Sequence, residues 1–332
     1  YTENQHIYQF ITQLHYRRYL NIYIHSNMFK KISRQFIAST LINSFVILLF
    51  IFNYYVLMFV HTRKIYKYNK NIIFYCIGNF LSLYILILYV QVYYQIIPSK
   101  CAYKIRQMGE HTETNLNSIF NPYFTQNILK ERTETMKTCE KCGMYRPPRA
   151  YHCYICDTCF MKMYHHSYIF NTCIGHTNYK YYYLLLMSNF IYSLFQLILL
   201  LYFAINARQT PQRMTFYALA IVSNSIFVVT SLIYLIINTK LLLYNETTTE
   251  RSAINNFLEG RDDYKDVFQE GVLCFEDEVH VKDRKILNPY FLGYKENIKE
   301  VFGDNYYEWI MPYFTGRSDG IYFKKSVINK EQ

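Results

Sequence analysis

The chain has 332 residues, of which 52% are apolar and 19% aromatic, and its formal net charge is +11. The charges are segregated away from long apolar stretches, so the basic excess is expected to flank membrane spans and meet anionic lipid. This pattern argues against a soluble protein. It also argues against a nucleic-acid partner, because proteins that bind nucleic acid gather Lys and Arg on one face or along one helix.

A polar segment, residues 1–34, precedes the first apolar stretch, and its mixed composition predicts no cleavable signal peptide. Four stretches then contain no Asp, Glu, Lys or Arg and reach the roughly 20 residues that a membrane helix needs. They are Gln35 to Val60, Asn71 to Ser99, Tyr181 to Ala207 and Met214 to Thr239. Soluble helices usually carry a charged face. The sequence therefore predicts an α-helical multi-pass membrane protein, with helices 1 and 2 in residues 35–99 and helices 3 and 4 in residues 181–239.

An even number of spans places the segment 1–34, the middle loop 100–180 and the tail 240–332 on one side of the membrane. Basic residues between 17 and 34 favour the cytosol for that side, whereas those between 63 and 70, in the first short loop, oppose it. The middle loop is rich in cysteine, and thiols available for metal are expected in a reducing compartment. We therefore expect the loop and both termini in the cytosol, at the endoplasmic reticulum, the Golgi or the plasma membrane.

The middle loop carries a dense set of metal-ligating side chains. Six of the chain's nine cysteines lie within residues 139–173 of this loop, in paired C-x2-C spacing and together with several histidines. Zinc takes four thiolate or imidazole ligands in a tetrahedron, so six Cys and two His make two closed, structural sites. A RING-type ligase, the nearest rival zinc module, would need a further C-x2-C pair after the histidines, and the loop has none.

The stretch from Cys139 to Asn178 resembles the cysteine-rich core of the DHHC protein S-acyltransferases, or palmitoyltransferases. The features that carry the resemblance are Cys139, Cys142, Arg146-Pro147, Arg149, His152-Cys153, Cys156, Cys159, His165-His166, Cys173-Ile174-Gly175 and Asn178. After the fourth span, Thr247 to Glu250 matches the family's Thr-Thr-x-Glu motif, and two later segments, 288–293 and 301–303, resemble its C-terminal motif.

The resemblance implies a ligand set for each of the two zinc ions. The first ion would be held by Cys139, Cys142, His152 and Cys159, and the second by Cys153, Cys156, His166 and Cys173. It also implies a palmitoyltransferase fold with the zinc domain between helices 2 and 3, and acyl-CoA (palmitoyl-CoA) and a protein substrate or partner as ligands.

The catalytic motif of the family, Asp-His-His-Cys, reads Tyr164-His165-His166-Ser167 here. By position, Ser167 replaces the nucleophile that carries the acyl group, His165 is its base, and Tyr164 replaces the aspartate that orients this base. A serine hydroxyl is a far weaker nucleophile than a cysteine thiolate and depends on a well-oriented base. Tyr164 carries no negative charge near neutral pH. Ile169 and Thr172 also depart from the family pattern, which has an aromatic residue and an asparagine there.

Two interpretations follow. The first is a catalytically deficient member of the family, a pseudoenzyme that keeps the zinc scaffold and membrane fold and acts as a partner, a regulator or a binder of acyl-CoA. The alternative is an active protein acyltransferase that uses Ser167 or another cysteine, of which Cys101, just past the second span, is the candidate.

Overall fold

The computed structural model describes residues 35–56, 72–104, 138–206, 211–261 and 283–326. The N-terminal segment 1–34 and the basic residues of the first short loop lie outside the described residues.

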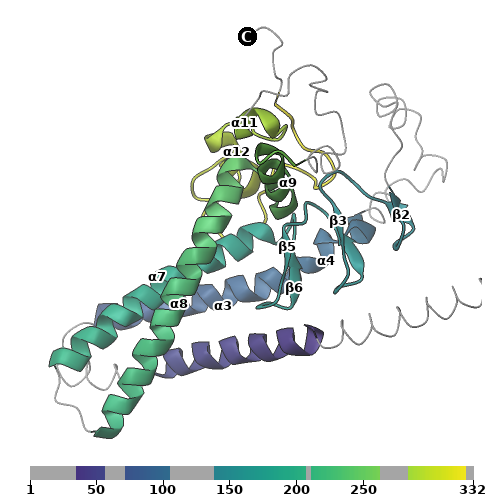
Figure 1. Ribbon diagram of the computed structural model, residues 1–332. Coiled ribbons are helices and arrows are strands. Elements are labelled where there is room, and N and C mark those ends of the chain that lie inside the picture. The colour runs from purple at the N-terminus through teal and green to yellow at the C-terminus, as the bar shows by residue number, and fades with distance from the viewer. Residues whose placement is uncertain (1–34, 57–71, 105–137, 207–210, 262–282, 327–332) are drawn as a thin grey trace, which may run out of the picture.

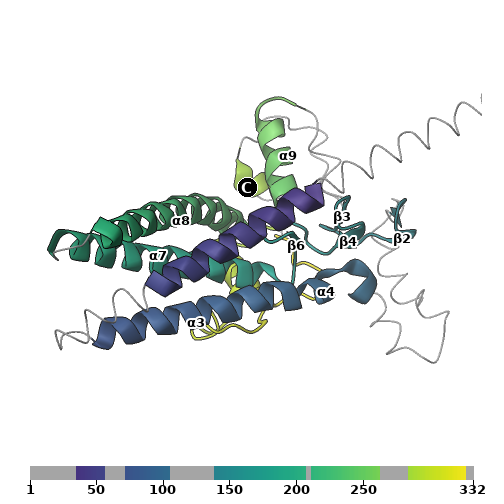
Figure 2. The same ribbon diagram turned by 90° about the horizontal axis from the view of Figure 1, so that it is seen from below.

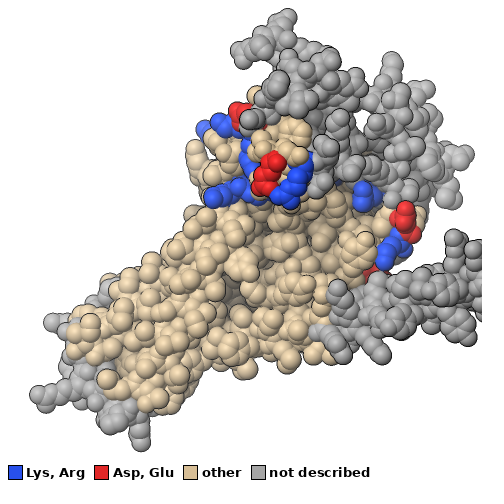
Figure 3. Space-filling model, in the orientation of Figure 1, with Lys and Arg blue, Asp and Glu red and all other residues tan. Residues whose placement is uncertain are grey.

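Four helices of the described chain are long and apolar enough to cross a membrane, as the sequence predicts. They are the first span (Gln35–Tyr55) and spans within α3 (Ile72–Tyr94), α7 (Tyr179–Asn206) and α8 (Pro211–Tyr244). Helix α7 packs against both α3 and α8 and is the most buried of the four, whereas the first span is the least buried (Figures 1 and 2). Charged side chains gather at one end of the molecule. The membrane-spanning helices show no charged side chains on the face in Figure 3.

Two helix ends differ from the predicted bounds. The second helix is interrupted at Gln95, where φ is −83° and ψ is 2°, and a short helix α4 (Ile96–Ser99) follows. Pro98 explains the break, because it has no N–H to continue the helical hydrogen bonds and its ring crowds the preceding turn. Helix α8 continues past Thr239, through Lys240, to Tyr244. Its last turn therefore carries the fourth span towards the zinc-domain end of the molecule.

The middle loop folds into three antiparallel hairpins. Strand β1 (Thr138–Cys139) pairs with β2 (Met144–Tyr145), β3 (Tyr151–Cys153) with β4 (Thr158–Phe160), and β5 (His165–Ser167) with β6 (Thr172–Ile174). An isolated hairpin is marginally stable at best in water. Strands this short bury little apolar surface, so cross-links such as metal ions are needed to hold them together.

The chain after α8 returns to the hairpins. Helix α9 (Thr248–Leu258) begins with a capping box in which Thr247 Oγ1 accepts from Glu250 N–H and the Glu250 carboxylate accepts from Thr247 N–H. The short helices α11 (Arg284–Leu287) and α12 (Tyr294–Phe302) follow. Residues of α3, the third hairpin, α7, α8 and α12 share one apolar core. The spans and the zinc domain are therefore packed as one unit.

Candidate metal centres and nucleophile site

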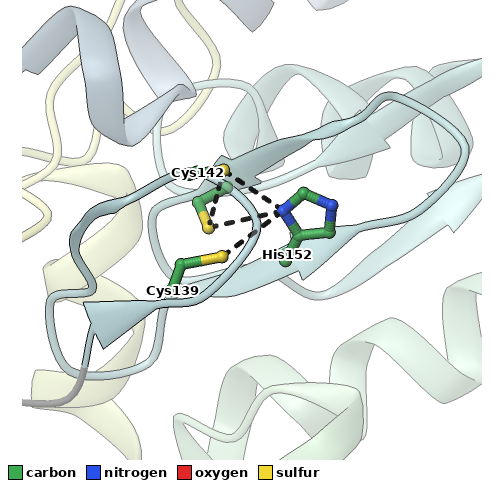
Figure 4. Close-up of side chains that lie close together, drawn as sticks. Cys139, Cys142 and His152 are labelled. Carbon is green, nitrogen blue, oxygen red and sulfur yellow. Dashed lines mark hydrogen bonds between the residues drawn. The ribbon is translucent and has the colours of Figure 1, made fainter. Parts of the chain in front are cut away.

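The first group of metal ligands joins the first and second hairpins. Cys139 and Cys142 come from the β1–β2 hairpin, and His152 and Cys159 face each other across β3 and β4. The sulfurs of Cys139 and Cys142 lie 3.6 and 3.2 Å from His152 Nδ1 (Figure 4). The Cys159 sulfur is 3.8 Å from the same nitrogen and 3.7 Å from the Cys142 sulfur. Four ligand atoms thus converge on one point.

The second group repeats this arrangement one hairpin further along. Cys153 and Cys156 come from the second hairpin, and His166 and Cys173 face each other across β5 and β6. His166 Nδ1 lies 3.6 Å from the Cys153 sulfur, 3.4 Å from that of Cys156 and 3.6 Å from that of Cys173. The eight residues therefore form the two sets of four that the family resemblance implies.

These distances fit two zinc ions. Tetrahedral zinc with bonds of about 2.3 Å to sulfur and about 2.0–2.1 Å to nitrogen needs S···S edges of roughly 3.75 Å and S···N edges of roughly 3.5 Å. The measured S···S distances are 3.7 and 3.6 Å, and the S···N distances run from 3.2 to 3.8 Å. With three thiolates and one imidazole each, both clusters are compatible with a closed, structural zinc site.

A sequence signal for this grouping exists in the residues themselves. Each ligand of the second group lies 14 positions after its counterpart in the first, from Cys139 and Cys153 through to Cys159 and Cys173. His152 and Cys153 are neighbours on β3, where consecutive side chains point to opposite faces. One face of the second hairpin therefore contributes to the first ligand group and the other face to the second. This hairpin links the two metal sites.

The catalytic-motif positions lie on the strand that supplies the second group. His165 and Ser167 are two apart on β5, so their side chains point to the same face. No hydrogen bond joins them among the described residues, and Ser167 Oγ accepts only a long bond, 3.5 Å, from Phe170 N–H. Burial lowers the pKa of His165 to about 4, and the neighbouring His166 adds to the shift. His165 is therefore neutral near pH 7.

The Tyr164 side chain packs on the first residue of α7. Its ring stacks on Tyr179 with centroids 3.8 Å apart and planes 3° from parallel, and only 3% of the residue is exposed. His165 Nδ1 is buried and has no hydrogen-bond partner in the described part of the chain. No acceptor in the described part of the chain therefore orients the His165 ring through this nitrogen.

Membrane helices hold the turn that follows Ser167. Ser39 Oγ donates to Tyr168 O at 2.5 Å, Asn43 Nδ2 to Ile169 O at 2.5 Å, and Tyr93 O–H to Phe170 O at 2.7 Å. Three successive carbonyls are therefore bound by side chains of the first span and α3. These contacts fix the nucleophile strand, β5 (His165–Ser167), to the spans. The sequence alone gave no signal for them.

A buried ion pair joins the zinc domain to α9. Arg149 Nε and Nη2 each lie 2.8 Å from an oxygen of Glu250. The match to the Thr-Thr-x-Glu motif did not suggest that Glu250 pairs with Arg149. Burial by itself would lower the pKa of Arg149, but the Glu250 carboxylate raises it above its ordinary value. Asn245 accepts from both Arg149 and Lys162. Thr248 Oγ1 donates to Tyr164 O, so the Thr-Thr-x-Glu segment also contacts the residue just before β5.

Cys101 lies beside the first ligand group. It is 1% exposed and shares an apolar cluster with Cys139, Cys142 and Cys159. Burial raises the pKa of its thiol to about 12, and the Cys142 charge adds to this. The thiol is therefore enclosed and protonated.

Comparisons with known proteins agree with this geometry. Residues 132–255 match the family model described as DHHC palmitoyltransferase. The chain is 29% identical over 184 residues to "Probable protein S-acyltransferase 12" of Arabidopsis thaliana, an alignment that covers 53% of this chain and 54% of that protein. It is 28% identical over 214 residues to "Palmitoyltransferase ZDHHC20" of Homo sapiens and 27% identical to "Palmitoyltransferase ZDHHC2" of Mus musculus, each over 63% of this chain and 51% of the relative.

The chain spans about half the length of the curated relatives it matches. The matched domain contains both four-ligand groups and lies among four membrane helices. Residues 132–255 thus form a domain similar to the DHHC palmitoyltransferases, in a chain whose curated relatives are named as protein S-acyltransferases and palmitoyltransferases.

Proposed function

We propose that this protein is a catalytically deficient palmitoyltransferase relative, which keeps the two-zinc membrane scaffold and acts as a partner or regulator of other proteins. The observation that carries the proposal is the pairing of Ser167 with a His165 whose Nδ1 has no acceptor in the described chain. A serine needs a well-oriented general base to attack an acyl group. Here the residue that would orient this base is a tyrosine stacked on Tyr179.

The packing around Ser167 supports the same conclusion. Ser167 is 6% exposed, and the Tyr182 ring lies 5.7 Å from the His165 ring and 5.8 Å from that of Phe170. These side chains belong to the continuous core of the spans. Because Ser167 is buried beside this packed core, we expect weak binding of palmitoyl-CoA.

The alternative, an active acyltransferase, would depend on Ser167. Cys101 is a poor substitute because its thiol is enclosed against the first ligand group and its raised pKa keeps it protonated. A serine ester is also a poorer acyl donor to a target thiol than a thioester is. These features favour the deficient form over a working enzyme with a displaced nucleophile.

The test is self-acylation of the purified chain with labelled palmitoyl-CoA in lipid nanodiscs. We expect no label on the native protein. Ser167→Cys should gain little, because catalytic residues that act as a unit are strongly non-additive. Ser167→Cys combined with Tyr164→Asp should gain more than either change alone, as a label that neutral hydroxylamine removes.

Matched variants separate the possible sources of label. Tyr164→Asn in the Ser167→Cys background opens the same space without a carboxylate and should stay as low as Ser167→Cys alone. Robust labelling of the native chain that disappears in Ser167→Ala would establish the active alternative and overturn the proposal. Labelling that disappears in Cys101→Ala would overturn it as well.

A further inference from the structure

A segment of the C-terminal tail, residues 305–314, presents apolar and aromatic side chains outward. We call it the aromatic segment. Its most exposed members are Tyr306 at 69%, Ile310 at 62%, Tyr307 at 60%, Met311 at 47% and Tyr313 at 45%. Glu308 is the single charged residue in the segment. A contiguous patch of this kind on a folded chain marks an interaction surface.

The aromatic segment lies against a membrane span. Tyr84, within α3, donates its hydroxyl hydrogen to Ile310 O, and Figure 2 shows the yellow C-terminal chain passing beside α3. Tyr84 precedes Tyr94, the last residue of α3, by ten positions, so the contact lies about 15 Å back along the helix. Phe80 and Leu83, on the adjoining surface of α3, are 69% and 57% exposed. The patch thus continues the lipid-facing surface of the span.

The backbone of the segment is already hydrogen-bonded within the protein. Lys180 is 1% exposed, and its ammonium donates to Glu308 O at 2.7 Å, Tyr313 O at 2.9 Å and Thr315 Oγ1 at 2.7 Å. Turn hydrogen bonds occupy the N–H groups of residues 308–311 and 313, and Trp309 Nε1 donates to Gly303 O at 3.1 Å. Non-helical backbone tolerates a membrane environment only when its polar groups are satisfied in this way.

We propose that the aromatic segment inserts into the interfacial layer of the lipid leaflet on the zinc-domain side. Tyr, Trp and aliphatic side chains with few charges are the composition of segments that lie in this layer. The Lys180 and Tyr84 contacts hold the segment at the level of the spans, where lipid is the neighbouring medium. The tail is then anchored to the membrane at a second place, beyond the end of α8.

The experiment uses Trp309, the only tryptophan of the chain, in the unaltered protein. The chain is reconstituted in nanodiscs of matched lipids with and without bromine on the acyl chains near the headgroup. We expect brominated lipid to lower Trp309 fluorescence at least twofold, while aqueous iodide has little effect.

Two variants calibrate the quenching, both in a Trp309→Phe background. Leu83→Trp places the reporter on the lipid-facing surface of α3, where brominated lipid should quench it. Ile286→Trp places it on α11, a 39%-exposed site at the far end from the spans (Figure 1), where iodide should quench it.

Two outcomes would overturn the proposal. Quenching of Trp309 by iodide without an effect of brominated lipid places the segment in water. Resistance to both quenchers means that protein rather than lipid surrounds Trp309, and light scattering of the nanodiscs would then show whether a second copy of the chain contributes to that cover.

Discussion

Lys162 lies in an unusual environment for a lysine. It is 4% exposed, and its ammonium donates to Asn245 Oδ1 at 2.9 Å. Burial lowers its pKa to about 7, and the nearby Arg149 charge adds to this. A protonated Lys162 therefore costs stability in the folded state, because its charge is poorly compensated there.

This shift gives a pH-dependent prediction. Between pH 7 and the ordinary lysine pKa, the unfolded chain binds a proton at this position that the folded chain does not, so Lys162 makes stability rise with pH over that window. Lys162→Met should flatten the rise in melting temperature between pH 7 and 10 and raise the melting temperature at pH 7. The exposed Lys295→Met should change neither. Equal pH profiles for the two variants would contradict the assignment.

The Arg149–Glu250 pair gives a second prediction at the residue scale. Both side chains are at most 2% exposed, and removing one partner of a buried pair leaves the other charge uncompensated. Glu250→Gln should therefore lower the free energy of unfolding by about 3–5 kcal/mol, measured by thermal denaturation. Glu259→Gln removes the exposed pair with Arg261 and should cost at most about 1 kcal/mol. A loss this small for Glu250→Gln would show that the pair is dispensable.

At the scale of elements, the zinc domain is a chain of three hairpins linked by two ligand groups. The first group ties the first hairpin to the second, and the second group ties the second hairpin to the third. The third hairpin also carries His165 and Ser167. The nucleophile strand thus depends on the second group directly and on the first only through the shared middle hairpin.

Metal content tests this arrangement. Cys142→Ala and Cys156→Ala should each lower the zinc content from two ions per chain towards one and destabilise the domain, because metal binding and folding are coupled. Cys101→Ala removes a buried thiol that belongs to neither group, and it should keep two ions. Elemental analysis of purified protein measures all three. One ion or none in the native chain would refute the assignment.

At the scale of the whole molecule, the spans and the zinc domain form a single body. Ile85 and Leu88 of α3, Phe170 and Ile174 of the third hairpin, and Phe302 of α12 pack in the same core. Charged side chains collect at the zinc-domain end (Figure 3). The zinc domain therefore sits directly on one membrane surface.

Which membrane surface this is can be measured. Because zinc thiolates are expected in a reducing compartment, we expect the zinc domain in the cytosol. A protease site inserted within residues 130–137 should be cut in sealed microsomes, and one inserted within residues 207–210 should be cut only after detergent is added. The reverse pattern would place the zinc domain in the lumen.

The sequence by itself determined the four spans and a set of eight ligands for two zinc ions, while the family resemblance divided these ligands into two groups and identified the degenerate catalytic motif. Each of these depends on residues close together in the chain: charge-free runs as long as a bilayer is thick, and C-x2-C pairs with their cross-strand His and Cys repeated after 14 residues. Such local patterns are constrained by fixed distances, those of a membrane and of a metal tetrahedron, so they can be read without a fold.

The tertiary structure alone decided the rest. Arg149 meets Glu250 across 101 positions, and Tyr84 meets Ile310 across 226. The stacking of Tyr164 on Tyr179, which leaves His165 without an acceptor, likewise follows from how α7 packs on the third hairpin. Contacts between distant segments arise from burial and shape in the assembled core, and no spacing in the sequence specifies them.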